Sequence, residues 1–355
     1  MLWLLELARP SLHLREYFAY QVIPLETVHA TKGEGIITSS IYRPSKRSIL
    51  LAYEKLIDEI YLEIPKAIVI DSFDVLTFIK DATIELTQKQ YILEAALEYL
   101  EYSYKKNTME KEEYLEMFHF LSKQRATLGR GIPLTIIPPA DPLHSHQAIR
   151  TTFGVGMVEN TFTSFIGIRP AYHDLYDSNH GFLRGTQIEF GDILLSHNKE
   201  KTALEKATIL SISSVTQRSR FIDGMSWRTK WGWDKNGLTD KAYFTGTVGV
   251  GLSYGNDYGY IYGFIDPLFY VENDFLTGIG GSVGIVIDGH QHANTNIELT
   301  QRIYENGVAQ RHANISQNFR VSQNIQLRFI YEMIEREQQT KFHEESFKTY
   351  LNLYF

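Results

Sequence analysis

The last third of the chain, from about residue 240 to Phe355, alternates apolar residues with small or polar ones at a period of two. In residues 243–254, Phe244, Val248 and Val250 share one parity, while glycine, threonine and serine take most of the other. Successive side chains of a β-strand point to opposite faces, so this period predicts strands with one apolar face. The pattern returns in residues 278–288, 295–304, 324–334 and 347–355. The sequence therefore predicts a long antiparallel meander.

Two architectures can cover the apolar face of such a meander: a sandwich packs it against a second sheet, and a membrane barrel turns it outward into lipid. Strands of about ten residues, with outward aromatics and inward polar residues, favour the barrel. A chain that ends within a strand on Phe355 also resembles bacterial outer-membrane barrels, whose terminal aromatic strand serves as an assembly signal. The alternative, a secreted all-β sandwich or soluble barrel, stays open because Arg311 falls on an otherwise outward parity.

The alternating segments after the middle of the chain number about twelve, and an even number is what single-chain bacterial barrels require. The fold class we predict is α+β, with a helical N-terminal portion followed by an antiparallel β-barrel. The predicted strands are residues 147–157, 160–170, 185–197, 203–216, 225–234, 241–254, 258–271, 278–288, 293–304, 308–319, 323–335 and 342–355.

Composition excludes several functional classes. The net charge of -7 and the mixed signs along the chain argue against a nucleic-acid partner. With no cysteine in the sequence, the chain carries neither a disulfide, a thiolate metal site nor a thiol nucleophile. No window of about 18 apolar residues predicts a transmembrane helix. We expect no cofactor.

Residues 1–142 form the predicted helical domain, and residues 143–355 the barrel domain. Ser45 is a candidate N-cap for a helix to about Ile60, and residues 82–106 and 110–128 predict an antiparallel helix pair. The proline-rich stretch before Pro142 marks the boundary. Residues 1–8 are apolar but lack the basic start of a signal peptide, so they indicate a core helix and a missing N-terminal segment.

Candidate site residues cluster where the barrel begins. Two imidazoles at i and i+2 on a strand, His144 and His146, would share one face, but the sequence offers no third metal ligand near them, so we predict no metal site. A second group flanks Pro170; its polar side chains either line a site or satisfy one another at the barrel rim. We expect no catalytic residue. The substrate-contact candidates are His144, His146, Arg150, Arg169, Tyr172, His173 and Asp174.

Six segments occur in a characteristic order: residues 4–10 (LLELARP), 22–28 (VIPLETV), 42–45 (YRPS), 168–175 (IRPAYHDL), 185–192 (GTQIEFGD) and 225–228 (MSWR). Together they resemble proteobacterial proteins that carry an Lnb N-terminal-like periplasmic domain, named for the Lnb type of lipoprotein N-acyltransferase. The resemblance implies a thiol acyltransferase chemistry with a Cys nucleophile and a His base, both upstream of the segment matched here. The substrate stays open among a lipoprotein, a phospholipid and a peptide. The match over residues 142–150 is partial, because a glycine expected between His and Ser is absent.

Two functional hypotheses follow. In the first, the chain is the C-terminal portion of an Lnb-like envelope protein, whose barrel anchors a periplasmic acyltransferase-like domain. In the second, it is a non-enzymatic outer-membrane barrel with a periplasmic helical plug or adaptor, serving transport or envelope structure. Both place the barrel in the outer membrane of a Gram-negative cell and the helices in the periplasm. Both expect outer-membrane lipid and the barrel assembly machinery as partners.

Overall fold

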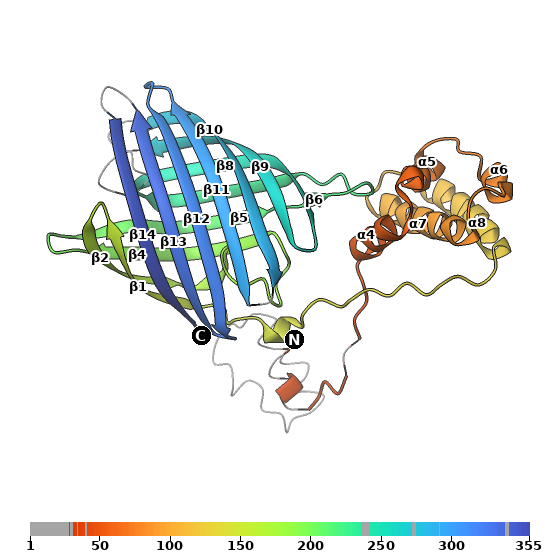
Figure 1. Cartoon of the computed structure of the whole chain (residues 1–355), viewed down its shortest axis with the longest axis horizontal. Helices are drawn as coiled ribbons and strands as arrows, with labels where there is room; N and C mark the ends of the chain where they lie inside the picture. Colours follow the sequence, from red (N-terminus) through yellow and green to blue (C-terminus); the bar gives the residue numbers. More distant parts are fainter. Residues whose placement is uncertain are drawn as a thin grey trace. The chain divides into compact units, whose positions relative to one another are not determined.

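The computed structural model divides the chain into two compact units (Figure 1). It describes residues 28, 31–33, 35–39, 41–235, 242–271, 275–290, 292–337 and 341–355. The first unit is Met1–Pro139 with Ser219–Asp223, and the second is Ala140–Arg218 with Gly224–Phe355. The core helix predicted at residues 1–8 lies outside the described residues.

The first unit is helical and has an apolar core. Ser45 caps its first long helix as predicted, because the Ser45 side chain accepts a hydrogen bond from the Ser48 N–H. The helix ends at Leu56 rather than near Ile60. The predicted pair is present. The elements are α4 (Lys46–Leu56), η2 (Glu59–Tyr61), α5 (Ile64–Ile70), α6 (Val75–Lys80), α7 (Leu86–Lys105) and α8 (Lys111–Thr127).

The helix pair packs through the stripe that its sequence period indicates. Leu93, Ala96 and Leu100 of α7 lie on one face and are fully buried. The ring of Tyr104 on α7 stacks on that of Tyr114 on α8 at 4.4 Å between centroids. Among the described residues, no helix is both long and apolar enough to cross a bilayer.

A short segment from the barrel half of the sequence completes the helical core. Phe221 and Ile222 are buried in the same apolar cluster as the α7 stripe. The ring of Phe221 lies 6.1 Å from that of Tyr99, and the guanidinium of Arg220 donates to Glu63 at 2.9 Å. The chain therefore returns to the helical unit after the barrel has begun, which the sequence analysis, with its single boundary at residue 142, did not foresee.

The second unit is a closed antiparallel β-barrel, as the alternation predicted. Each long strand pairs with the next along the chain, β1 pairs with β14, and pairing of β2 with β4 closes the wall. Twelve long strands remain when the short β3 and β6 are set aside. They are β1 (Arg150–Val158), β2 (Thr161–Arg169), β4 (Thr186–His197), β5 (Thr202–Ser214), β7 (Ser226–Asp234), β8 (Tyr243–Asn256), β9 (Gly259–Val271), β10 (Phe275–His290), β11 (Ala293–Tyr304), β12 (Ala309–Ser322), β13 (Ile325–Glu337) and β14 (Lys341–Tyr354).

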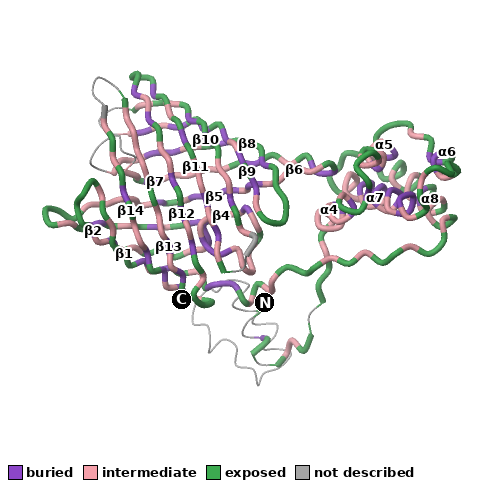
Figure 2. Tube along the Cα trace, viewed as in Figure 1, coloured by how far each residue is buried: buried purple, intermediate pink, exposed green. Residues whose placement is uncertain are grey.

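Buried and exposed residues alternate along much of the barrel wall, which is visible as changes of colour along the strands in Figure 2. On β9, Ile261 and Ile265 are exposed, whereas Tyr260, Tyr262 and Phe264 on the other parity are buried. The apolar parity therefore faces outward, and the inward parity carries aromatic, polar and charged side chains. This confirms the barrel prediction and excludes the sandwich, whose apolar face would be covered by a second sheet.

Glycines on β8 and β10 make room for the inward aromatic side chains of β9. A Cβ at Gly251 would lie 2.7 Å from the ring of Phe264, and one at Gly284 would lie 2.3 Å from the ring of Tyr262. A residue with a Cβ would clash with the ring at either position. Each aromatic ring of β9 therefore packs over a glycine of the neighbouring strand. The glycine parity seen in the sequence is therefore a packing requirement of the lumen.

One expectation about the start of the barrel is wrong. The first strand begins at Arg150, three residues after its expected start, but Pro142–His144 forms a short 3-10 helix, η3, capped by the side chain of Asp141, where the paired histidines were expected on a strand. His144 and His146 consequently do not share a strand face: His144 is exposed, and His146 is buried.

Candidate functional site

The chain after β2 folds back over one end of the barrel, the end where β1 begins and β14 finishes, which we term the closed mouth. Pro170 follows β2 directly, and the short strand β3 (Ala171–His173) pairs with β4. Residues 174–185, the plug loop, then connect to β4. A local turn fixes its first residues, since Asp174 Oδ1 accepts from Tyr176 N at 2.9 Å and Asp177 Oδ2 accepts from Asp174 N at 3.1 Å.

Three guanidiniums from the barrel wall converge on the two carboxylates of the plug loop. Arg169 donates to Asp174 at 3.0 Å and to Asp177 at 2.7 Å. Arg328 donates to Asp174 at 3.1 Å and to Asp177 at 2.7 Å. Arg150 forms a short ion pair with Asp174. We refer to Arg150, Arg169 and Arg328 as the arginine cluster.

The strand register explains why this cluster needs an anion. Arg150 on β1 lies directly opposite Arg169 on β2, and like charges in that position repel. All three guanidiniums are buried: Arg169 is 0% exposed, and the other two are nearly so. A carboxylate that contacts both arginines removes this repulsion, and Asp174 does so.

The plug carboxylates respond to this environment. Burial alone would raise the pKa of Asp177, but Arg169, Arg150 and Arg328 outweigh it and hold that pKa well below its usual range. For Asp174, likewise, burial is outweighed by the nearby guanidiniums, and its pKa is lowered. Both carboxyl groups are therefore ionised across the physiological pH range.

A second layer of ion pairs lies behind the first. Arg150 also donates to Asp192 at 3.2 Å, Lys206 pairs with the same carboxylate, and Glu189 lies 3.7 Å from Arg169. Four basic groups thus meet four carboxyl groups, two of which belong to the plug loop.

Further hydrogen bonds tie the plug loop to the opposite wall. Arg184 donates to both oxygens of Asp288 at the end of β10, at 2.7 and 2.6 Å. Asn179 donates to Asp288 at 3.1 Å, and Asn294 of β11 donates to the Asp177 carbonyl at 2.8 Å. The loop is therefore bonded to strands on both sides of the lumen and spans this mouth.

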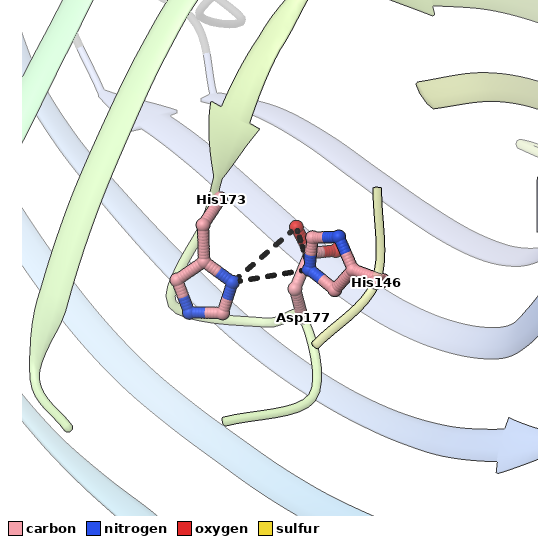
Figure 3. Close-up of side chains that lie close together, drawn as sticks. All are labelled: His146, His173 and Asp177. Carbon is pink, nitrogen blue, oxygen red and sulfur yellow. Dashed lines mark hydrogen bonds and ion pairs between the residues drawn. The ribbon is translucent and has the colours of Figure 1, made fainter. Parts of the chain in front are cut away.

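His146, His173 and the plug-loop residue Asp177 lie close together (Figure 3). The Nδ1 of His146 is 2.7 Å from the Gln147 carbonyl, which can only accept, so this nitrogen carries the proton. The Nε2 of His146 then accepts from His173 Nδ1 at 3.3 Å. Burial lowers the pKa of His146, against the opposing effect of Asp177, and so favours the neutral imidazole.

The same three side chains present a possible set of metal ligands, with the His146 and His173 nitrogens 3.7 and 3.9 Å from Asp177 Oδ2. That oxygen, however, already accepts from Arg169 and from the Asp174 amide, which uses both of its lone pairs. A dication would also lie beside the arginine cluster. The donor set therefore fits a hydrogen-bonded histidine pair better than a metal.

The structure brings five of the seven predicted site residues together: His146, Arg150, Arg169, His173 and Asp174. His144 lies apart, where its carbonyl accepts from Arg320, and Tyr172 contributes its carbonyl, which accepts from Arg169 at 2.9 Å. Asp177, Asp192 and Arg328 were missed. The inward parity of Arg328 could have indicated its place, but no pattern indicated the partners of Asp177.

Comparisons with known proteins identify the barrel half of the chain. A family model described as "Domain of unknown function (DUF7840)" matches residues 139–354. Among curated proteins, none matches the sequence.

Several solved structures resemble the barrel at low sequence identity. The NanC porin aligns with 58% of this chain and 100% of its own, at 6% identity and a TM-score of 0.39. The KdgM porin aligns with 58% and 99%, at 10% identity and a TM-score of 0.36. An outer membrane channel from Pseudomonas putida F1 aligns with 59% and 96%, at 7% identity and a TM-score of 0.39.

Proposed function

The chain belongs to the DUF7840 family, a domain of unknown function, and we propose that it is a non-enzymatic outer-membrane barrel, closed in the described state, that anchors a helical adaptor in the periplasm. The observation that carries this proposal is the Ser219–Asp223 segment, through which the barrel half of the sequence builds part of the helical core. Its partners would be outer-membrane lipid and the barrel assembly machinery.

The outer face of the barrel supports a membrane location. On β14, the outward side chains Phe347 and Leu351 are apolar and exposed, as is the terminal Phe355, whereas the outward His343 and Glu345 beyond them are polar. Nine residues of a strand tilted as in membrane barrels span about 23 Å, close to the roughly 25 Å apolar band of such proteins. A contiguous apolar belt of this kind needs lipid, since soluble monomers rarely expose more than a few hundred Å² in one patch.

The polar groups at the closed mouth support a structural role rather than catalysis. Their carboxylates and guanidiniums pair with one another, the arrangement expected of buried polar groups in a structural role. Ser145, which the sequence places between two histidines, donates its hydroxyl to the Pro142 carbonyl at 2.6 Å and not to an imidazole. Neither flanking histidine is therefore placed to activate it.

The anchoring role is tested by removing the apolar contacts of the inserted segment. In the double variant Phe221→Ala and Ile222→Ala, we expect the helical unit to become sensitive to protease, while the barrel keeps its heat-modifiable mobility on gels. Met225→Ala, an exposed residue just beyond the segment, is the control and should behave as wild type. Equal protease resistance in all three proteins would argue against the anchor.

Location is tested separately by fractionation. We expect the chain in the outer-membrane fraction and its helical unit resistant to protease added to intact cells, but cleaved once the outer membrane is permeabilised. Recovery in the soluble fraction would contradict the membrane location, and cleavage in intact cells would contradict the periplasmic placement of the helices.

A second, alternative proposal is that the anchored domain is part of an Lnb-like acyltransferase. It rests on the six sequence segments that resemble that family. Because this sequence has no cysteine, it should not transfer acyl groups through a thioester. The test incubates it with a labelled lipid donor and an acceptor lipopeptide, beside a chain extended upstream through the family's Cys. Transfer by neither protein would remove this proposal and leave the barrel anchor intact.

A further inference from the structure

We propose that the arginine cluster is a binding site for a dianionic solute, of the carboxylate or phosphate type, within a gated lumen, and that Asp174 and Asp177 occupy it as internal substitutes for that solute. This inference rests on the membrane location proposed above. It adds a second, open state in which the plug loop withdraws from the closed mouth.

The first step is that the basic and the acidic side chains of the site belong to different kinds of structural element. Arg150, Arg169 and Arg328 are fixed in the wall by strand pairing, on β1, β2 and β13. The carboxylates that neutralise them belong to a loop, and loops move more readily than a closed sheet does. Withdrawal of the plug loop would therefore leave the site intact and remove its anions.

The second step is the charge that would remain. With the plug loop withdrawn, the three arginines and Lys206 would face two wall carboxyl groups, those of Glu189 and Asp192. Arg150 and Arg169 would again lie directly opposite each other with no bridging anion. An anion entering from solution would relieve that repulsion in the same way as Asp174 does now.

The third step is that the site holds unused donors. Among the described residues, the Nε atoms of Arg150, Arg169 and Arg328 are buried without a hydrogen-bond partner. Two aspartates thus satisfy only part of the donor set. A phosphate or a polycarboxylate offers more oxygens in a smaller volume and could use these N–H groups, since guanidinium geometry suits both.

The fourth step is a polar path beyond the site. The inward faces of β11–β14 carry a row of carboxamides rather than apolar side chains, which is the lining expected of a hydrated passage. They are Asn294, Asn296, Gln310, Asn314, Asn318, Gln326 and Asn352, all buried in the described state.

The test uses the full chain in planar lipid bilayers. The double variant Asp174→Asn and Asp177→Asn keeps the shape of the plug loop but removes its charge. We expect wild type to be silent and the variant to conduct, with a rise in conductance on the order of tenfold or more, because breaking a buried ion pair from one side is strongly unfavourable. In a salt gradient, the reversal potential should show anion selectivity, and added citrate should block the current.

The matched control is Asp266→Asn with Glu298→Gln. These carboxylates pair with Arg228 inside the lumen, at 2.8 and 3.1 Å, and not with the arginine cluster. The two control substitutions remove the same formal charge as Asp174→Asn with Asp177→Asn, and we expect the control variant not to conduct. Conduction by the control equal to that of the Asp174 and Asp177 variant would show a general loss of packing and would overturn the proposal.

A second variant keeps the test decisive if the asparagine variant fails to fold. Residues 174–184 are replaced by a glycine-serine linker of equal length, and thermal unfolding is followed with inorganic phosphate, citrate or chloride. Phosphate or citrate should raise the melting temperature of the linker variant and leave wild type unchanged. Cation selectivity, or no stabilisation by either anion, would contradict the proposal. Failure of the chain to enter membranes at all would instead reject the membrane location.

Discussion

The helical unit buries mainly apolar side chains, whereas the barrel also buries many polar and charged ones. In the helical unit, Leu93 and Leu100 are fully buried in an apolar cluster. In the barrel, Arg169 and Asp177 are as deeply buried, while Ile261 and Ile265 are exposed. The difference shows that buried side chains need not be apolar, and that in the barrel the apolar side chains lie on the outer face of the sheet. The two units differ in what covers their apolar surface. In the helical unit it is covered by other parts of the protein, and in the barrel, in our proposal, it is covered by lipid.

The two cores also gain stability by different routes. Apolar burial contributes about 25 cal/mol per Å² and needs no partner. A buried charge needs a partner, because losing one member of a pair leaves the other unsolvated. Single substitutions should therefore act through different mechanisms in the two units, and the following predictions run from the largest expected effect to the smallest.

The largest effect is expected from Arg169→Met, which leaves Asp174 and Asp177 short of a buried partner. We expect a loss of about 3–5 kcal/mol in the free energy of unfolding, measured by denaturant unfolding in detergent micelles. The control is Arg311→Met, whose exposed guanidinium lies 3.8 Å from Glu335 and should contribute below about 1 kcal/mol. Equal losses would mean that the cluster is not the stabilising core of the closed mouth.

The helical core is tested by Leu93→Ala, which opens a cavity in an apolar environment. We expect the helical unit to lose about 2–5 kcal/mol, measured by hydrogen exchange of its amides, with the barrel amides unchanged. On the barrel surface, Leu252→Ala removes the same atoms from an exposed position and should cost less. A larger effect at Leu252 would reverse the comparison.

The outer belt is tested by Val250→Arg in the middle of β8. We expect insertion into lipid vesicles to become less favourable by about 2–4 kcal/mol, because an arginine at the bilayer midplane must be desolvated. The control is Ile60→Arg on the exposed surface of the helical unit, which should leave insertion unchanged. Unchanged insertion of the Val250→Arg protein would place that face in water.

The smallest predicted effect is a pH dependence from His146. Because burial lowers its pKa below the ordinary 6.5, its stabilising contribution is present above pH 6.5 and decreases as pH falls below that value. Asp177, Arg169 and Asp174 face the ring and stay charged throughout. Between pH 7.5 and 5.5, wild type should lose more free energy of unfolding than His146→Gln, and identical pH profiles would contradict the neutral assignment.

The sequence predicted the barrel wall well, because a period of two depends on local geometry alone. All twelve long strands lie within a few residues of their predicted bounds. The wall also explains the partial success at the site, since Arg150 and Arg169 lie in strands whose parity is readable. The plug loop could not be predicted in the same way. Asp177 meets Arg328 across a separation of 151 residues, and no local pattern encodes such a contact.

The place of Ser219–Asp223 in the helical unit was missed for a similar reason. Phe221 and Ile222 are two apolar residues in a connection between strands, and such residues usually lie at a turn or near the rim. Their place in the helical core depends on long-range packing with residues such as Tyr99. The helices α5 and α6 were also overlooked, because seven and six residues are too few for a clear helical period.

The most direct test of the central claim, that the apolar parity faces lipid, uses the absence of native cysteine. Two single-cysteine proteins, Ile265→Cys and Ile60→Cys, are reconstituted into vesicles and treated with a water-soluble maleimide. Ile265 is 59% exposed on the barrel surface, and Ile60 is 78% exposed on the helical unit, so both would react readily in water. We predict that Ile60→Cys is labelled at once, whereas Ile265→Cys is protected until the protein is denatured. Rapid labelling of both would show that the belt lies in water and would contradict the membrane barrel.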